Sequence, residues 1–148
     1  ILEDTTSKQF VTVFYGILDP VRGTLAYCNA GHNPPFLFRN GGSAAVQELD
    51  NTGPPLGLRL FADVTWGQRT VRLAPGDALV LYSDGITDAQ DDQGDFFDEG
   101  RLRAAGQANL GRSAQDVQAA ILTEVDRFVG DAPQADDITL MVLVRQSP

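Results

Sequence analysis

The chain has 148 residues and a formal net charge of −9. This length suits one domain with a real core, and the 43% of hydrophobic residues is typical of globular proteins. The acidic surplus argues against nucleic acid as a partner, because a nucleic-acid surface needs clustered cations. No apolar run is long enough to span a bilayer and no signal-peptide pattern opens the chain, so we expect no membrane partner. The single cysteine, Cys28, favours a cytoplasmic location.

Strand patterns separated by turn signals fill the first half of the chain, after residues 1–9, which show no period and are expected to form a loop. Pro20 and Gly23 mark a turn between the first two strands, and Asn40-Gly41-Gly42 marks a second hairpin. The predicted strands cover residues 10–18, 24–29, 36–39, 45–49, 65–73, 78–82 and 138–144.

The pattern becomes helical after Asp84. Residues 99–108 are a modest helix candidate, and residues 113–128 are a strong one because Ser113 is suited to cap the helix with Asp116 three residues later. One face of the second helix is apolar, at Val117, Ile121, Val125 and Phe128. Strands, then two helices, then a last strand predict an α+β fold with a mostly antiparallel sheet.

The first candidate functional residue is Asp84, which follows the apolar run 78–82 in the sequence Ser83-Asp84-Gly85. A carboxylate at a strand end, followed by a glycine that lets backbone approach, suits a hard cation or a phosphate held through one. An aspartate that only caps the turn is the plain alternative, and the tripeptide alone leaves both open.

A second acidic point, Asp136 and Asp137, lies just before the last predicted strand. If that strand pairs antiparallel with strand 78–82, Asp136 comes beside Asp84, and we expect their carboxylates roughly 4–6 Å apart. Converging carboxylates repel one another unless a cation lies between them. Mg²⁺ or Mn²⁺ is favoured because the sequence offers no Cys/His ligand set.

An ordered series of motifs covers nearly the whole chain. The motifs are Phe10-Val11-Thr12-Val13-Phe14, Tyr27-Cys28-Asn29-Ala30-Gly31-His32-Asn33-Pro34-Pro35, Gly53-Pro54-Pro55-Leu56-Gly57-Leu58, Leu73-Ala74-Pro75-Gly76-Asp77, Tyr82-Ser83-Asp84-Gly85-Ile86-Thr87-Asp88-Ala89 and Asp136-Asp137-Ile138-Thr139. In this order they resemble the metal-dependent (PPM, type-2C) serine/threonine phosphatases of the SpoIIE/RsbU branch.

The resemblance implies an antiparallel β-sandwich with flanking helices and a site for two Mn²⁺ or Mg²⁺ ions. By this resemblance Asp84 and Asp136 are metal ligands, Asp137 stands beside them and the Gly85 backbone lies near the metal. Paired ions roughly 3.5–4 Å apart activate a water and clamp the phosphoryl oxygens, so no protein nucleophile is required. The implied substrate is phosphoserine or phosphothreonine on a regulatory protein of the anti-anti-sigma type.

Members of that family also carry an upstream Gly-Asp motif whose Asp bridges both metals, on a strand that has no counterpart in residues 1–148. We therefore expect one truncated phosphatase domain, with its N-terminal portion missing, that is inactive alone. Missing strands would leave the strands at 10–18 and 78–82 partly uncovered, which predicts a homodimer through exposed strands.

Two alternatives accompany this interpretation. A haloacid-dehalogenase-like phosphatase also has an apolar strand ending in Asp-Gly-x-Thr, but its nucleophilic Asp should stand where this chain has Tyr82, and its fold needs parallel strands. A non-catalytic module of the PPM type that binds a partner is the second alternative. The expected absence of the bridging Asp favours that alternative, and the retention of Asp84 and Asp136 opposes it.

Overall fold

The computed structural model describes residues 10–41, 46–58 and 63–146. The chain divides into two compact units, which are described separately below. The first unit takes residues 1–34 and 49–73, and the second takes residues 35–48 and 74–148. Each unit has its own antiparallel sheet, and the helices belong to the second unit.

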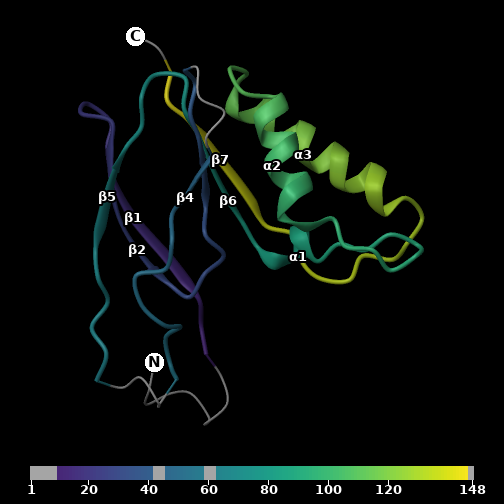
Figure 1. Cartoon of the computed structure of the whole chain (residues 1–148), viewed down its shortest axis with the longest axis horizontal. Helices are drawn as coiled ribbons and strands as arrows, with labels where there is room; N and C mark the ends of the chain where they lie inside the picture. Colours follow the sequence, from purple (N-terminus) through teal and green to yellow (C-terminus); the bar gives the residue numbers. More distant parts are fainter. Residues whose placement is uncertain (1–9, 42–45, 59–62, 147–148) are drawn as a thin grey trace. The chain divides into compact units, whose positions relative to one another are not determined.

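The first unit contains a three-stranded antiparallel sheet in the order β1-β2-β5 (Figure 1). Its strands are β1 (Val13–Asp19), β2 (Thr24–Ala30) and β5 (Arg69–Arg72). The predicted first hairpin is confirmed, but β1 begins three residues later than expected. The reason is that its partner ends at Ala30, after which Gly31 takes a φ of +71° that ends the ladder. The strand predicted at 65–73 is also shorter, because β5 pairs only with the first four residues of β2.

A buried asparagine fixes the loop after β2. The Asn29 side-chain amide donates to the carbonyl oxygens of His32 (3.1 Å) and Leu49 (3.2 Å), and its oxygen accepts from the His32 N–H (2.9 Å). The Asn29 N–H donates to the Thr52 hydroxyl at 2.9 Å. Asn29 is fully buried, so these bonds are needed to satisfy its polar atoms. This part of the Tyr27–Pro35 motif therefore has a structural role.

The second unit contains a four-stranded antiparallel sheet in the order β4-β3-β6-β7. Its strands are β3 (Phe36–Phe38), β4 (Val46–Glu48), β6 (Ala78–Tyr82) and β7 (Leu140–Val144). The predicted second hairpin is confirmed by the β3–β4 pair, and the predicted antiparallel pairing of 78–82 with the last strand is confirmed by the β6–β7 pair. That pair ends with Tyr82 opposite Leu140.

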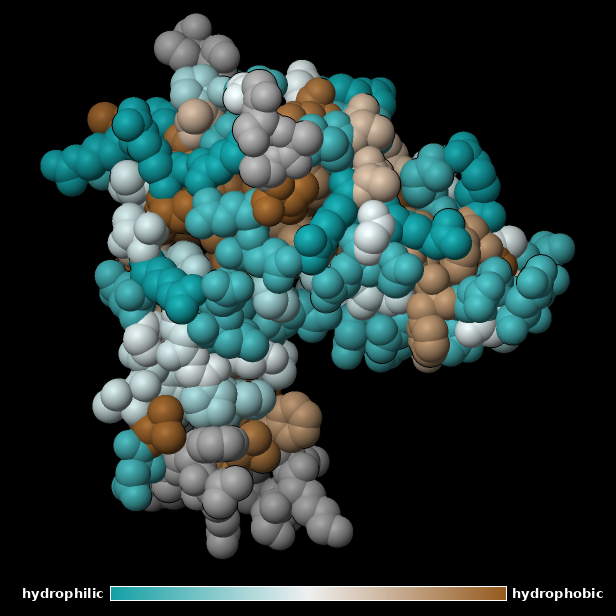
Figure 2. All heavy atoms as spheres, viewed as in Figure 1, coloured by the Kyte–Doolittle hydropathy of each residue, from teal (hydrophilic) through white to brown (hydrophobic). Residues whose placement is uncertain are grey.

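The described part of this second unit contains three helices: α1 (Asp84–Thr87), α2 (Asp98–Ala108) and α3 (Ala114–Val129). The prediction for α3 is confirmed in detail, since the Ser113 hydroxyl accepts from the Asp116 N–H at 3.1 Å. The apolar face of α3 is buried, as predicted, while the visible surface over α2 and α3 is mostly hydrophilic (Figure 2). The four-residue helix α1 was not predicted as an element.

The core of the second unit lies between the sheet and α2 and α3. Its largest fully buried side chains are those of Tyr82, Phe36, Phe38, Ile86, Leu102, Ile121, Val80, Val117 and Val125. Helix α2 approaches β3 so closely that a Cβ on Gly106 would lie inside 3.0 Å of the Phe38 ring. This contact explains a glycine within the last turn of a helix, where it is otherwise unfavourable.

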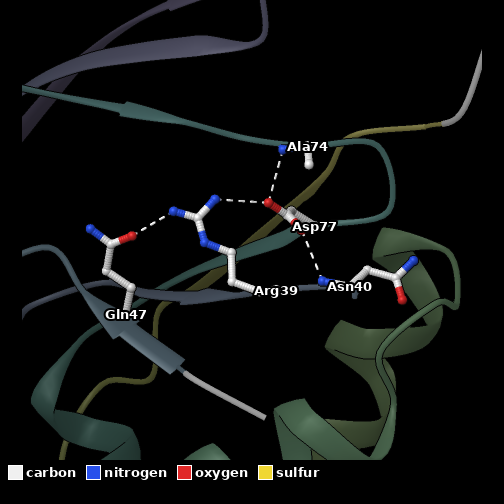
Figure 3. A network of polar contacts seen from close by, with 5 residues as sticks. All are labelled: Arg39, Asn40, Gln47, Ala74 and Asp77. Carbon is white, nitrogen blue, oxygen red and sulfur yellow. Dashed lines mark hydrogen bonds and ion pairs between the residues drawn. The ribbon is translucent and has the colours of Figure 1, made fainter. Parts of the chain in front are cut away.

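A buried aspartate holds the turn that precedes β6 (Figure 3). The Asp77 carboxylate accepts from the Arg39 guanidinium (2.9 Å) and from the N–H groups of Asn40 and Ala74 (2.8 Å each). Asp77 is only 1% exposed, so its charge is stabilised by the ion pair and the two N–H donors. In addition, Arg39 donates to Gln47, which links the network to β4.

The predicted fold class is confirmed: two antiparallel sheets with flanking helices form an α+β protein. None of the helices in the described part of the chain combines the length and the apolar character needed to cross a membrane.

Candidate functional site

The candidate site begins where β6 and β7 end together. Ser83, directly after β6, donates its N–H to the Thr139 carbonyl oxygen (3.0 Å). Its hydroxyl accepts from the Thr139 N–H (2.9 Å) and donates to the Asp137 carbonyl oxygen (3.1 Å). The sequence predicted no separate role for Ser83. These bonds extend the β6–β7 pairing by one residue and fix the acidic segment 136–137 next to the start of α1.

Asp84 is the first residue of α1, and it is exposed. Its backbone carbonyl accepts from the Asp88 N–H (2.8 Å) and the Thr87 hydroxyl (3.2 Å). Its carboxylate makes no hydrogen bond or ion pair to any other residue of the described segments. The helix therefore does not use this side chain as a cap, and the carboxylate is available to a ligand.

Gly85 is the point of closest approach between the two acidic segments. A Cβ at this position would lie inside 3.0 Å of both the carbonyl carbon and the carbonyl oxygen of Asp137. Because the obstacle is backbone, it cannot move aside as a flexible side chain would. Gly85 thus lets α1 pack directly on the backbone between Asp137 and Ile138.

Asp136 and Asp137 are both exposed. One Asp136 oxygen accepts from the Asp137 N–H at 2.7 Å, and the Gln134 side-chain amide donates to the Asp136 carbonyl oxygen at 2.7 Å. Neither aspartate has an Arg, Lys or His partner within the segments that the structure describes. The Gln134 contact holds the segment in a defined turn, which the sequence pattern gave no means to predict.

These residues fit a hard divalent cation in their chemistry. The Asp84, Asp136 and Asp137 carboxylates supply oxygen ligands of the kind that Mg²⁺ and Mn²⁺ prefer, and no protein cation neutralises them among the described residues. No group of three or more His, Cys, Asp or Glu side chains that could hold a metal ion forms within those same residues. The three carboxylates are therefore suited to such a cation in their chemical type, but within the described residues they are not gathered into a complete metal-binding group. The expected 4–6 Å separation of Asp84 and Asp136 stays a prediction.

The haloacid-dehalogenase alternative conflicts with this geometry. Strand β6 lies between β3 and β7 and pairs antiparallel with both, whereas that fold requires parallel neighbours. Tyr82, at the position of that enzyme's nucleophile, is 1% exposed and packs against the Phe36 ring at a centroid distance of 5.2 Å. Tyr82 is therefore a core residue.

Comparison with known proteins identifies the family. The model of the family described as Stage II sporulation protein E (SpoIIE) matches residues 1–146. The chain belongs to this family of PPM-type phosphatases.

Two relatives align with almost the whole chain. Protein IcfG of Synechocystis sp. (strain ATCC 27184 / PCC 6803 / Kazusa) is 32% identical over 137 residues, which is 93% of this chain and 21% of that protein. Phosphoserine phosphatase RsbU of Bacillus subtilis (strain 168) is 28% identical over 144 residues, which is 97% of this chain and 42% of that protein. The chain thus spans less than half the length of either relative.

Solved structures show the same fold at low identity. The SiaA-PP2C domain of Pseudomonas aeruginosa has a TM-score of 0.70 and 24% identity, with 83% of this chain and 47% of that chain covered. The catalytic domain of the serine/threonine protein phosphatase PstP, solved with two manganese ions, has a TM-score of 0.61 and 14% identity, covering 92% of this chain and 59% of that chain. PPM-type structures similar to this chain therefore include one that holds manganese.

Proposed function

We propose that this chain forms part of the active site of a metal-dependent phosphatase that removes phosphate from a serine or threonine of a regulatory protein. Asp84 and Asp136 are the proposed ligands of Mn²⁺ or Mg²⁺, with Asp137 beside them. The observation that carries the proposal is the packing of Gly85 on the Asp137 backbone, which joins two exposed acidic segments at one end of the β6–β7 pair. Family membership supports the reaction class.

In this proposal the residues of the chain position the metal-binding carboxylates, and no side chain acts as a nucleophile. Divalent ions, when bound, supply a water of lowered pKa and neutralise the phosphoryl oxygens. Ser83 holds the two acidic segments in register, and Gly85 lets their backbones meet. Because Asp84 and Asp136 are exposed, ions held by their carboxylates would be accessible to a phosphate on the surface of another protein.

A regulatory phosphoprotein of the anti-anti-sigma type is the proposed substrate, since a relative of this chain is named a phosphoserine phosphatase. A cytoplasmic location is proposed with it, on the single cysteine of the chain.

The test is an isothermal titration calorimetry experiment that measures the affinity for Mn²⁺. It is done on this chain and on a version extended at its N-terminus. Asp84→Asn should weaken Mn²⁺ binding by at least about 10-fold, because even residues that only support a metal ligand contribute that much. Asp88→Asn is the matched control, since it removes the same charge at the end of the same short helix. In the extended chain, Asp84→Asn should also remove most Mn²⁺-dependent phosphatase activity. Equal Mn²⁺ affinity in the two variants would contradict the proposal.

A second candidate function, a module that binds a partner without catalysis, has one observation in its favour. No set of three metal-ligating side chains forms within the described residues, which suits weak metal binding by this chain alone. The same titration separates the two functions. A non-catalytic module remains inactive in the extended chain with excess Mn²⁺, whereas the phosphatase becomes active.

Self-association through β1 is proposed as well. In the described sheet β1-β2-β5, β1 pairs on one side only, and Tyr15 and Ile17 are 62% and 61% exposed. An apolar edge strand of this kind is a template for pairing with a second copy. Ile17→Lys should shift a low-micromolar sample toward monomer in sedimentation, whereas Val21→Lys, in the turn after β1, should not. A wild-type chain that sediments as a monomer would contradict this proposal.

A further inference from the structure

A cavity of about 280 Å³ opens beside the candidate site, within the second unit. It lies between α1, the C-terminal half of α3 and the segment 130–138. Gly85 and Ile138 form part of its wall, and they directly follow Asp84 and Asp137 in the sequence. The wall also includes Gln134, whose amide is bonded to the Asp136 carbonyl oxygen. A group bound at the carboxylates of Asp84 and Asp136 would therefore lie next to this cavity.

The wall of the cavity combines several apolar side chains with one negatively charged group. Val125, Val129, Ala132 and Pro133 line it together with Ile138. Asp126 is also in the wall, is exposed, and has no ion pair with any other described residue. Among the residues that the structure describes, no Lys or Arg lines this wall.

The end of α3 adds to this negative potential. Asp126 is in the last turn of the helix, which has 16 residues and ends at Val129. The C-terminus of a helix carries a partial negative charge that favours a nearby cation. The basic residue of that turn, Arg127, is paired with Glu124 at 2.6 Å, and both line a different pocket. Arg127 therefore does not neutralise the negative charge that Asp126 and the helix end place beside the cavity.

We propose that this cavity accepts the side chain of a lysine or arginine that lies beside the phosphorylated residue of the substrate protein. This inference rests on the proposed phosphatase function and adds a sequence preference to it. The volume is at the lower end of small-molecule sites, so it suits one long side chain. Lysine and arginine place an apolar stem along such a wall and keep the charged end at the rim, where Asp126 is exposed.

The test measures binding of phosphoserine peptides to this chain by fluorescence anisotropy. In an alanine background, a single lysine is placed in turn at each of four positions around the phosphoserine and compared with norleucine, which has a similar stem without charge, and with glutamate. At one position the lysine peptide should bind about 3- to 10-fold more tightly than its norleucine counterpart, from the ion pair and the helix end together. The glutamate peptide should bind most weakly.

Two variants and a matched control connect this preference to the cavity. Asp126→Asn should reduce the lysine preference to less than about 2-fold, since it removes the charge and keeps the shape. Ala132→Phe should fill the cavity and remove the advantage of both lysine and norleucine over alanine. Asp131→Asn removes an equal charge from a nearby exposed residue that is not in the wall, and it should keep the lysine preference.

The inference is overturned if the lysine, norleucine and glutamate peptides bind equally, or if the lysine preference survives in both Asp126→Asn and Ala132→Phe. Circular dichroism of each variant identifies any loss of folding. If Ala132→Phe is unfolded, the lysine preference of Asp126→Asn alone decides whether the inference holds. Failure of the phosphatase proposal is seen separately, as a Mn²⁺ affinity that does not depend on Asp84. If the wild-type chain shows no lysine preference while its Mn²⁺ binding depends on Asp84, only the cavity proposal is rejected.

Discussion

Two aspartates flank the same strand, β6, and their environments are opposite. Asp77 precedes the strand, is 1% exposed and accepts hydrogen bonds from Arg39, Asn40 and Ala74 (Figure 3). Asp84 follows the strand, is exposed, and its carboxylate has no bonding partner among the described residues. Both belong to family-like motifs, so a motif match alone does not separate a structural acid from a functional one.

The difference follows from how each charge is compensated. A buried carboxylate is tolerated only when ion pairs and hydrogen bonds replace the water that it loses, and Asp77 has both. Such an acid is shielded from external ligands by its burial and its protein partners, and it contributes to stability. Asp84 has water around it and is compensated by no protein cation within the described segments, so its substitution should affect ligand binding more than folding.

The largest effect on stability is expected for Asp77→Ala. This change leaves the Arg39 guanidinium, which is partly buried, without its carboxylate, and it leaves two backbone N–H groups without acceptors. Breaking a pair of this kind should lower the free energy of unfolding by about 3–5 kcal/mol. Urea unfolding of Asp77→Ala and Asp84→Ala side by side measures the contrast. Similar losses in the two variants would show that burial does not distinguish these acids.

A smaller loss is expected for Gly85→Ala. The new Cβ would lie inside 3.0 Å of the Asp137 backbone, so α1 and the segment 137–138 must separate. Overpacking of this kind should destabilise the chain by about 1–3 kcal/mol and weaken Mn²⁺ binding as the acidic segments move apart. Gly41→Ala is the matched control, because a Cβ there meets nothing within 4 Å. Unchanged Mn²⁺ affinity in Gly85→Ala would separate this contact from the metal site.

Much of the fold could be predicted from local patterns. The apolar run at 78–82 has the same bounds as β6, and the Ser113 cap with its apolar periodicity located α3. Helix α1 was missed because four residues are too few to show a helical period. The ends of β1 and β5 were misjudged because they depend on where a partner strand ends, which composition does not encode.

The sequence predicted which residue types form the candidate site, but it did not predict the contacts that surround them. Asp84 and Asp136 follow from strand ends and pairing, and the pairing itself is confirmed. The Arg39–Asp77 ion pair joins residues 38 positions apart and left no periodic signal, so the sequence indicated only a turn there. Asp126 had no recognisable signal in the sequence, because a cavity is formed by packing and has no sequence pattern.

Tyr82 lies in the strand between the two aspartates, where a substitution should change the free energy of unfolding by about 1 kcal/mol. Its hydroxyl is buried, and no other residue of the described segments offers it a hydrogen bond. Tyr82→Phe should therefore raise the free energy of unfolding by about 1 kcal/mol near neutral pH. Tyr15→Phe, at an exposed hydroxyl, should change it little. A clear loss of stability in Tyr82→Phe would contradict this prediction and indicate that the hydroxyl is bonded.

Because Tyr82 can ionise, the difference in unfolding free energy between wild type and Tyr82→Phe should depend on pH. Burial raises the pKa of the Tyr82 hydroxyl above its usual value, and the nearby Glu99 and Glu48 raise this pKa further. A raised pKa in the folded state stabilises the fold below the unfolded-state pKa of about 10, and this contribution is lost as the pH rises above that value. Urea unfolding between pH 8 and pH 11 should show a decline that is shallower in Tyr82→Phe. Parallel declines would show that Tyr82 does not titrate with folding.

The smallest effect on stability is expected for Asp84→Asn, and here the absence of a change is informative. The carboxylate has no partner to lose among the described residues, so the free energy of unfolding should stay within about 0.5 kcal/mol of wild type. Mn²⁺ changes this comparison, because an ion that binds only the folded state stabilises it by about 1.4 kcal/mol at ten times its dissociation constant. Wild type should therefore gain thermal stability in millimolar Mn²⁺, and Asp84→Asn should not. If both chains gain equally, the ion is held elsewhere and Asp84 is no ligand. If neither gains while an N-terminally extended chain does, the metal site requires residues beyond these 148, and Asp84 is then to be tested as a ligand in the extended chain.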